Sequence, residues 1–339
     1  MTAIPPTVAA IFEAGGPRLA ERAVAVDGLV TELVSAIPGP TGQRASAVVA
    51  AGGKRLRPLL ALLLAGDPAD ADLTAGSGSA SSAAVERSLR VSAAAVELTH
   101  VATLVHDDVL DRAPLRRGIP TVWATDGAEA ARGAGDALLA AAFAAVARDA
   151  AAPVARVLAT AASSLAAGEL MQRADAYRLD ITPSRYEERV IGKTAALFEA
   201  ACRIGALHGD LDEDLAGHIG RDLGVAFQML DDLLDIEGDP EVTGKARGTD
   251  LLDGTVTLPL AIAARADETL ATVELRTLDV PEAAALCDRI IATGATTEVR
   301  AQAYARIDRA QDAIADLPGS PARRAALALA ARGIVDRAS

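Results

Sequence analysis

Apolar residues recur at every third or fourth position along most of this 339-residue chain, a spacing typical of amphipathic helices. The pattern covers residues 83–106, 136–147, 155–172, 186–207, 212–236, 281–293 and 298–315. The sequence contains no convincing run of alternating β-branched residues, so a sheet is not expected. Ala, Leu and Val supply most of the apolar 51%, and aromatic residues only 2%. Because Ala and Leu are strong helix formers, the sequence predicts an all-α protein, a large bundle packed on small side chains.

Turn-forming residues separate these segments. Residues 37–42 contain two prolines, residues 66–82 are rich in Asp, Gly and Ser, and residues 238–254 contain several glycines. We interpret residues 66–82 as a surface loop and not as a linker, because motifs on both sides of it are expected to act together. No repeat of 20 to 50 residues indicates a solenoid. The chain is therefore interpreted as a single domain covering residues 1–339.

Charge and cysteine content limit the partners and the compartment. A net charge of −13 argues against nucleic acid or an anionic membrane surface as a partner, because both need a basic surface. Cys202 and Cys287 are too few for a disulfide scaffold and fit a reducing cytoplasm. Uncharged apolar runs such as residues 137–147 are shorter than the roughly 20 residues of a membrane-spanning helix. We expect a cytoplasmic protein with no transmembrane segment.

Two nearly identical acidic clusters lie 124 positions apart, each at the end of an apolar helical segment. The first consists of Asp107, Asp108 and Asp111, and the second of Asp231, Asp232 and Asp235. On a helix, the first and last carboxylates of each cluster share one face. Such close like charges repel unless a cation lies between them, and hard oxygen ligands favour Mg²⁺ together with substrate phosphates. A single copy would be equally compatible with a solvated helix end, whereas two copies favour metal binding.

Lysine is rare in this chain, since only three of its 33 basic residues are lysines. Lys54, Lys193 and Lys245 each lie beside a glycine, which allows a ligand to approach the backbone closely. An ammonium is a compact point charge and is not equivalent to guanidinium, so these lysines are candidate phosphate ligands, although chance placement in solvent remains an alternative. Arg116 and Arg117 follow the first cluster and can bind phosphate through two nitrogen atoms. We infer a di- or polyphosphate ligand bridged by Mg²⁺.

Taken in chain order, these residues resemble the trans-isoprenyl (polyprenyl) diphosphate synthases, in particular their medium- and long-chain members. Residues 52–58 are similar to the family's GGKRxRP motif, and residues 100–118 to its first aspartate-rich motif with the following Arg-Arg-Gly. Residues 193–194 match the KT motif, residues 227–235 match FQxxDDxxD and residues 244–250 match GKxxGxD. The resemblance spans residues 52–259. It implies the all-α isoprenoid synthase fold with both acidic clusters facing a central cavity, and a homodimer.

The resemblance also implies a role for each matched residue. The diphosphate of the homoallylic substrate, isopentenyl diphosphate, would be bound by Lys54, Arg57, His100 and Arg117. The allylic diphosphate would be bound by Arg116, Lys193, Thr194, Gln228 and Lys245. Mg²⁺, three ions per active site with substrate bound, would be ligated by Asp107, Asp111 and Asp231, supported by Asp108, Asp232 and Asp235.

One position departs from the family pattern. Many members carry a lysine in a GKxTLP segment, whereas residues 254–259 of this chain have Thr255 at that place. One phosphate contact is therefore missing, and Lys245 or Arg247 is expected to supply more of it.

The implied reaction is ionisation, condensation and elimination, with the six cluster aspartates and Lys193 as catalytic groups. Divalent metal would neutralise the charge that develops on the departing diphosphate, and Lys193, Lys245 and Arg116 would add electrostatic stabilisation. The double bond of isopentenyl diphosphate would attack the allylic cation, and a proton would then be lost. No protein nucleophile is needed.

Product length is predicted from the helix that precedes the first cluster. Ala102 and Thr103 lie five and four residues before Asp107, where short-chain family members typically carry a bulky aromatic residue. We therefore expect a product of five or more isoprene units. A short-chain farnesyl or geranylgeranyl diphosphate synthase is the alternative, because small residues also serve close helix packing.

Three other functions fit part of the pattern. A class I terpene cyclase also ionises a diphosphate with metal, but it needs no second diphosphate site such as residues 52–58 with Arg117. A regulatory subunit that retains the fold usually loses one aspartate-rich motif, and both are intact here. A plain metal- or polyphosphate-binding protein would show no turnover.

Overall fold

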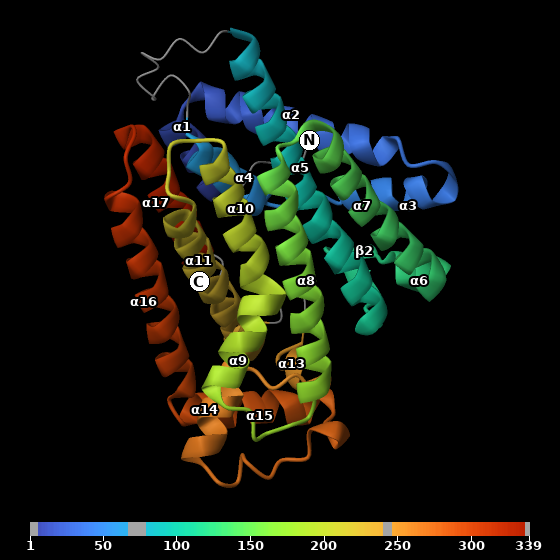
Figure 1. Cartoon of the computed structure of the whole chain (residues 1–339). Coiled ribbons are helices and arrows are strands. Elements are labelled where there is room, and N and C mark those ends of the chain that lie inside the picture. Colours follow the sequence, from blue (N-terminus) through green and yellow to red (C-terminus); the bar gives the residue numbers. More distant parts are fainter. Residues whose placement is uncertain (1–5, 67–78, 240–245, 336–339) are drawn as a thin grey trace. The chain divides into compact units, whose positions relative to one another are not determined.

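The computed structural model of the chain describes residues 6–66, 79–239 and 246–335, and these residues are mainly helical (Figure 1). The first helices are α1 (Pro6–Gly15), α2 (Pro17–Ser35), α3 (Gly39–Ala50), α4 (Leu56–Ala65), α5 (Ser79–Leu110), α6 (Val122–Asp126), α7 (Ala128–Asp149) and α8 (Ala152–Asp175). They are followed by α9 (Pro183–Val190), a π-helical segment (Ile191–Ala195), α10 (Ala196–Leu207), α11 (Glu213–Glu237), α13 (Thr249–Leu252), α14 (Leu258–Ala266), a 3₁₀ turn (Leu275–Thr277), α15 (Val280–Ala292), α16 (Ala295–Ala315) and α17 (Pro321–Val335).

The predicted all-α class is confirmed, and all seven predicted segments are helical. The strands of the described residues are β1 (Leu115–Arg116) and β2 (Ile119–Pro120), which form one antiparallel hairpin and no larger sheet. Lys245 and most of the predicted loop at residues 66–82 lie outside the described residues. The predicted loop is wrong at its end, because residues 79–82 already belong to α5.

The predicted turn at residues 37–42 is wrong in its second half. Helix α2 ends at Ser35 and α3 already begins at Gly39. Pro40 occupies the first turn of α3, where a backbone N–H has no partner within the helix and its absence costs nothing. A proline that the sequence suggests as a turn residue is therefore a helix-starting residue.

The chain divides into two compact units, and the boundaries between them fall inside α8, α10, α11, α16 and α17. Unit 1 comprises Met1–Ala162, Glu199–Gly217 and Ile314–Ala330. Unit 2 comprises Ser163–Phe198, His218–Ala313 and Ala331–Ser339. The interpretation of residues 1–339 as a single domain stays a prediction.

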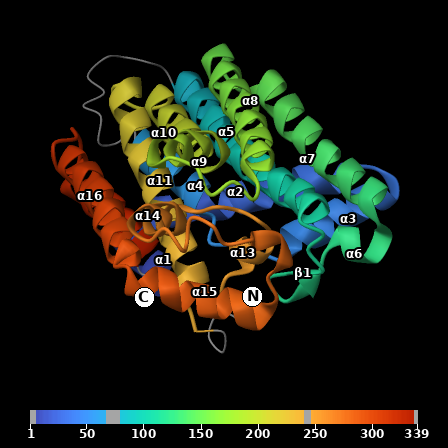
Figure 2. The ribbon, with the colours of Figure 1, turned by 90° about the horizontal axis from the view of Figure 1, so that it is seen from below.

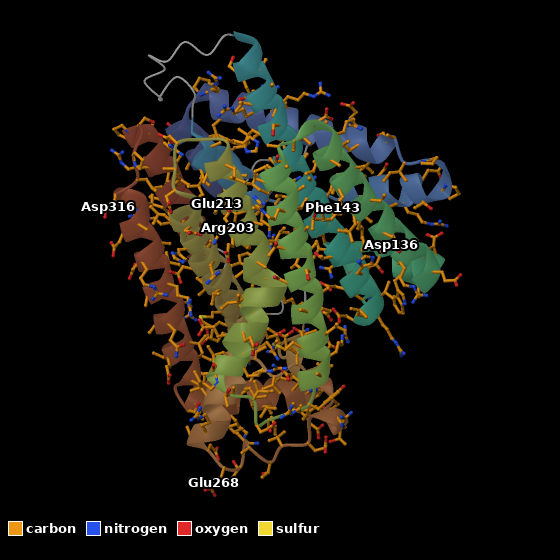
Figure 3. All side chains as sticks on the ribbon, viewed as in Figure 1. Asp136, Phe143, Arg203, Glu213, Glu268 and Asp316 are labelled. Atoms are coloured by element: carbon orange, nitrogen blue, oxygen red, sulfur yellow. The ribbon has the colours of Figure 1, made fainter. Side chains whose placement is uncertain are left out.

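In unit 1, α5 packs against α2, α3, α4, α6 and α7, and its course beside α7 can be followed in Figure 1. Ala95 and Ala102 of α5 and Ala134 and Ala142 of α7 are all fully buried. Asp136 of α7, labelled in Figure 3, lies with its Oδ1 3.1 Å from Nε2 of His106 on α5. Small side chains thus let these two long helices lie close together, as the composition predicts.

Two buried arginines hold the C-terminal end of α4. Arg323 of α17 donates Nε to the carbonyl oxygen of Leu63 at 2.9 Å and Nη2 to that of Leu64. Arg22 of α2 donates Nη1 to the carbonyl oxygen of Gly66 at 2.6 Å. The last carbonyls of a helix have no partner within it, so these guanidinium groups cap α4 from two distant segments. Arg323 belongs to the last eighty residues, in which the sequence shows no assignable motif.

In unit 2, α13, α14 and α15 lie near one another below α11 in the view of Figure 2. Helix α15 starts with a capping box, in which Asp279 Oδ1 accepts from the backbone N–H of Glu282 and Glu282 Oε2 accepts from that of Asp279, both at 2.9 Å. The ring of Tyr177 packs directly against Gly254, which has φ of +74°, and a Cβ added at Gly254 would lie 2.3 Å from this ring. The segment around Thr255 is therefore fixed by a position that only glycine fits.

Among the described residues, α7 and α8 are long and apolar enough to cross a membrane by length and composition alone, and both are partly buried in the protein. Core helices of soluble proteins can be equally long and apolar. Helix α7 is longer than the apolar run at residues 137–147, because it continues through the charged residues Arg132, Asp136 and Arg148. The expected absence of a transmembrane segment stays a prediction.

Close packing of α10 on α4 gives a stability prediction. A Cβ added at Gly205 would lie 2.5 Å from the Ala61 carbonyl oxygen, so Gly205→Ala should destabilise the protein by about 1–3 kcal/mol through overpacking. Gly28 on α2 has no such neighbour within 4 Å, so Gly28→Ala should stabilise by about 0.5–1 kcal/mol. Urea denaturation followed by circular dichroism measures both, and equal stability of the two variants would contradict the packing argument.

Candidate active site

One face of α5 is accessible near the end of the helix, after a stretch in which residues 91–99 are all buried. From residue 100 onward His100, Thr103, Leu104, His106, Asp107 and Val109 are partly exposed, and Leu110 and Asp111 are exposed. The candidate site residues among them are His100, Thr103, Asp107 and Asp111. Their spacing of three or four residues puts them on one side of the helix. The structure therefore brings the predicted histidine and the outer carboxylates of the first cluster onto one stripe of α5. Ala102, in contrast, is fully buried.

The middle carboxylate of the first cluster points away from that stripe. Asp108 is only 4% exposed, and its Oδ1 accepts from Nε of Arg116 at 2.6 Å. Burial raises the pKa of Asp108, and the charge of Arg116 opposes that rise. This ion pair ties the β1–β2 hairpin to the end of α5. Arg116 binds the protein's own carboxylate through Nε, and its other two nitrogen atoms can still donate to a ligand.

The hairpin and the turn before α4 bring a basic group to the same part of unit 1. An added Cβ at Gly53 would lie 3.0 Å from Nη2 of Arg117, so this guanidinium lies against the glycine turn. The pKa of His100 is well below its usual value because burial and the charges of Arg57 and Arg117 disfavour the imidazolium. His100 is therefore neutral at physiological pH and can donate or accept a hydrogen bond. The four residues predicted to bind isopentenyl diphosphate all belong to unit 1.

The second cluster repeats this pattern on α11. Gln228, Asp231 and Asp235 are partly exposed at spacings of three and four residues, whereas Asp232 is 2% exposed. Asp232 Oδ2 accepts from the hydroxyl of Tyr186 at 2.6 Å, and its Oδ1 accepts from Nε2 of Gln228 at 2.8 Å. Burial raises the pKa of Asp232 to about 7 although both hydrogen bonds oppose the rise. In both clusters the middle carboxylate is thus buried and the outer ones are not.

Asp235 fixes the segment that follows α11. Its Oδ1 and Oδ2 accept from the backbone N–H groups of Thr249 and Asp250, both at 3.1 Å, and so cap the N-terminus of α13. The pKa of Asp250 lies well above its usual value because of burial and of the nearby charges of Asp235, Asp232 and Asp231. Negative charge is therefore concentrated at this end of α11.

A π-helical segment carries the KT motif and crosses α8 at a pair of glycines. An added Cβ at Gly168 would lie 2.3 Å from the backbone nitrogen of Lys193, so the two backbones are in direct contact. Lys193 Nζ lies 2.6 Å from Glu169 Oε2, and Thr194 donates its hydroxyl to Gln228 Oε1 at 2.8 Å. Segments of π-helix are frequent at functional sites. The structure thus joins Lys193, Thr194 and Gln228 within unit 2.

The predicted site residues therefore fall into two groups, one in each unit. The predicted arrangement of both acidic clusters around one cavity stays a prediction, as do the residue roles that it implies. Lys245 lies outside the described residues, so its predicted phosphate contact stays a prediction as well. Arg247 donates Nε to the carbonyl oxygen of Ile236 and Nη2 to Asp288 Oδ1, both at 2.8 Å, so two of its three nitrogen atoms hold the protein itself.

Sequence reasoning missed two side chains that hold these groups. Tyr186 is one of only three tyrosines in the chain, and scarcity, which singles out the lysines, would have singled it out too. Glu169 carries no such signal, because glutamate is common on helices and its contact with Lys193 depends on the crossing of two segments.

No group of three or more Asp, Glu, His or Cys side chains among the described residues is placed to hold a metal ion on its own. The donors that the two stripes offer are carboxylate oxygens, the ligand type that Mg²⁺ prefers. This ion usually takes only one or two protein carboxylates and completes its shell with water and phosphate oxygens. The residues present therefore fit Mg²⁺ that arrives with a phosphate ligand.

The hydrogen bond from Tyr186 to Asp232 gives a prediction. Tyr186→Phe removes a donor from a buried carboxylate and should lower the free energy of unfolding by about 1–3 kcal/mol. Tyr304→Phe is the matched control, since Tyr304 is 38% exposed on α16, and its effect should stay within about 0.5 kcal/mol. Urea denaturation of both variants tests this, and equal midpoints would show that the hydroxyl does not stabilise Asp232.

Comparison with known proteins identifies the family. Residues 41–289 match the family model for polyprenyl synthetase. The chain is 36% identical over 311 residues to heptaprenyl diphosphate synthase component 2 of Geobacillus stearothermophilus, which covers 90% of this chain and 92% of that protein. It is 37% identical over 246 residues to geranylgeranyl diphosphate synthase of Methanosarcina mazei, and the match covers 70% of this chain and 72% of that protein.

A solved structure agrees with these relatives. The polyprenyl synthase of Caulobacter crescentus CB15, determined in complex with calcium and isoprenyl diphosphate, superposes with a TM-score of 0.82 at 32% identity, covering 95% of this chain and 97% of that one. The match to the family model spans well over half of the chain, and the resemblance inferred from the motifs is confirmed. The protein therefore belongs to the polyprenyl synthetase family and is an all-α prenyltransferase of isoprenoid biosynthesis.

Proposed function

We propose that the protein is a trans-polyprenyl diphosphate synthase that joins isopentenyl diphosphate to an allylic diphosphate with the help of Mg²⁺. The observation that carries this proposal is the shared design of the two acidic clusters. In each, the middle carboxylate is buried and hydrogen-bonded while the outer carboxylates are exposed or partly exposed. Two near copies of this pattern favour metal binding over two solvated helix ends.

The homoallylic substrate is assigned to unit 1. Lys54, Arg57, His100 and Arg117 would bind its diphosphate. Neutral His100 would contribute a hydrogen bond beside cationic groups that supply the charge attraction, and guanidinium groups bind phosphate through paired N–H donors. Fixing this diphosphate would hold the reacting double bond in place. The entropy lost in bringing the two reactants together would then be supplied by binding and would no longer add to the activation barrier.

The allylic diphosphate is assigned to Arg116, Lys193, Thr194, Gln228 and Lys245. Lys193 lies against Glu169 at 2.6 Å, so an incoming phosphate would compete with this carboxylate for the ammonium group. Thr194 and Gln228 already hydrogen-bond to each other, which limits their rotation before substrate arrives. A preorganised donor set stabilises charge that develops on the leaving group.

Asp107, Asp111 and Asp231 would ligate Mg²⁺, three ions per active site with substrate bound, and Asp108, Asp232 and Asp235 would support them. When bound, the ions would neutralise charge on the diphosphate leaving group. The carbon–oxygen bond of the allylic substrate would break, the double bond of isopentenyl diphosphate would form the new carbon–carbon bond, and the released diphosphate would take up the proton that is lost. Tyr186 and Arg116 would keep the buried middle carboxylates in place throughout.

Metal removal tests the reaction. Labelled isopentenyl diphosphate is incubated with dimethylallyl, geranyl, farnesyl and geranylgeranyl diphosphates, with Mg²⁺ and after chelation. We expect elongation of at least one primer with Mg²⁺ and a loss of more than about 100-fold in rate without it, since metal stabilisation of the leaving group is worth several kcal/mol. Full turnover after chelation, or no elongation of any primer, would refute the proposal. Incubation with geranyl diphosphate alone separates a terpene cyclase, which would consume it.

Product length follows from α5, for which we propose five or more isoprene units. Thr103→Phe should shorten the product, because Thr103 is partly exposed on the same stripe of α5 as Asp107. Ala102→Phe fills a fully buried position and should also destabilise the protein by about 1–3 kcal/mol. Reverse-phase chromatography of the products measures the change. An unaltered distribution with Thr103→Phe would contradict the role of this face and favour a limit set by other helices, and a short wild-type product would favour a farnesyl or geranylgeranyl diphosphate synthase.

The proposal includes a homodimer, which the family resemblance implies, in the cytoplasm, which the low cysteine content favours. Sedimentation equilibrium that gives twice the mass of the chain would support the dimer.

A further inference from the structure

The residue before α4 has an unusual backbone conformation. Arg55 has φ of 49° and ψ of 35°, the left-handed region that costs energy for any residue other than glycine. It lies between Lys54 and Arg57, which are both assigned to the homoallylic diphosphate. Surrounding contacts must hold Arg55 in this conformation, and its guanidinium group supplies them.

Three hydrogen bonds hold that group. Nη1 donates to Glu97 Oε1 at 2.6 Å, Nε to Asp27 Oδ1 at 3.1 Å and Nη2 to the carbonyl oxygen of Val49 at 3.3 Å. The side chain of Glu97 is 3% exposed, whereas that of Asp27 is 58% exposed. Exposed ion pairs are weak, and a buried carboxylate needs its cation. Glu97 is therefore the dominant partner of Arg55.

Glu97 also lies on the helix that carries the first acidic cluster. It is three residues before His100 on α5, so the two side chains lie on the same side of the helix one turn apart. On the turn itself, Gly53 lies against the guanidinium group of Arg117. One partly buried ion pair thus joins the turn at residues 52–57 to the helix that presents His100.

We propose that Glu97 is a positioning residue that acts through Arg55 and fixes the turn so that Lys54 and Arg57 bind the homoallylic diphosphate together with His100. This inference rests on the proposed function and deepens it by naming what sets the geometry of this subsite. Glu97 itself does not touch the diphosphate, since a buried carboxylate would repel it.

Electrostatics alone predicts the opposite result of a substitution. If Glu97 acted only as a charge, Glu97→Gln would leave Arg55 uncompensated, the turn would become more positive and isopentenyl diphosphate would bind more tightly. If Glu97 positions the turn, the same substitution lets Arg55 leave its left-handed conformation and the diphosphate binds less well. The direction of the change in KM distinguishes the two.

The experiment measures steady-state kinetics for both substrates with Glu97→Gln. We expect KM for isopentenyl diphosphate to rise about tenfold, while kcat and KM for the allylic substrate change less than about threefold. Arg55→Gln should raise the same KM, and the double variant should resemble Arg55→Gln because both changes break one interaction. Should Glu97→Gln fail to fold, Arg55→Gln alone decides the matter.

Glu86→Gln is the matched control. Glu86 lies on the same helix and forms a similar pair with Arg22, 2.5 Å apart, in the same unit but beside the other end of α4. It should lower stability without changing KM for isopentenyl diphosphate. An unchanged or lowered KM with Glu97→Gln, equal rises for both substrates, or additive effects in the double variant would each overturn the inference. Failure of the wild-type protein to consume isopentenyl diphosphate would instead refute the proposed function.

Discussion

A carboxylate buried at the end of an apolar helix needs a donor of its own, and this requirement organises both halves of the candidate site. Asp108 is satisfied by Arg116, which brings the β1–β2 hairpin against the end of α5. Asp232 is satisfied by Tyr186, which brings α9 against α11, and by Gln228 of α11 itself, which in turn accepts from Thr194 of the π-helical segment. The bonds of Arg116, Tyr186 and Thr194 thus fix segments that also carry cationic groups assigned to a diphosphate. The proposed metal ligation and phosphate binding would both depend on the same buried oxygens.

Close backbone approach is the second requirement, and the composition supplies it. Gly168 lets α8 touch the backbone of Lys193, and Gly53 lets the guanidinium group of Arg117 lie against the turn before α4. A Cβ at Gly168 would meet backbone atoms of the crossing segment, whereas a Cβ at Gly53 would displace the tip of the Arg117 side chain. A chain with 28 glycines and 2% aromatic residues can place long helices and charged side chains at such short range. The scarcity of large side chains in the core is therefore a condition of the site's geometry.

The sequence predicts the helices well because their signal is local. Spacing of apolar residues defines α5 and α11, and the acidic pentapeptides mark the ends of these two helices without any knowledge of the fold. What it misses depends on contacts between distant segments. Arg323 caps α4 from a position about 260 residues away, and Glu169 meets Lys193 only because two segments cross at glycines. Pro40 shows the same limit at short range, since a proline fits both a turn and the first turn of a helix.

The two clusters share a pattern but differ in the charge of the donor that satisfies the middle carboxylate. Asp108 is paired with a guanidinium group, so its negative charge is compensated within the protein. Asp232 receives hydrogen bonds from a hydroxyl and an amide, which stabilise an anion without adding positive charge. Asp250 lies close enough to Asp232 and Asp235 to feel their charges. Burial raises the pKa of Asp232 to about 7 despite these donors and the charge of Arg189, so a divalent cation bound near this end of α11 would favour the ionised carboxylate.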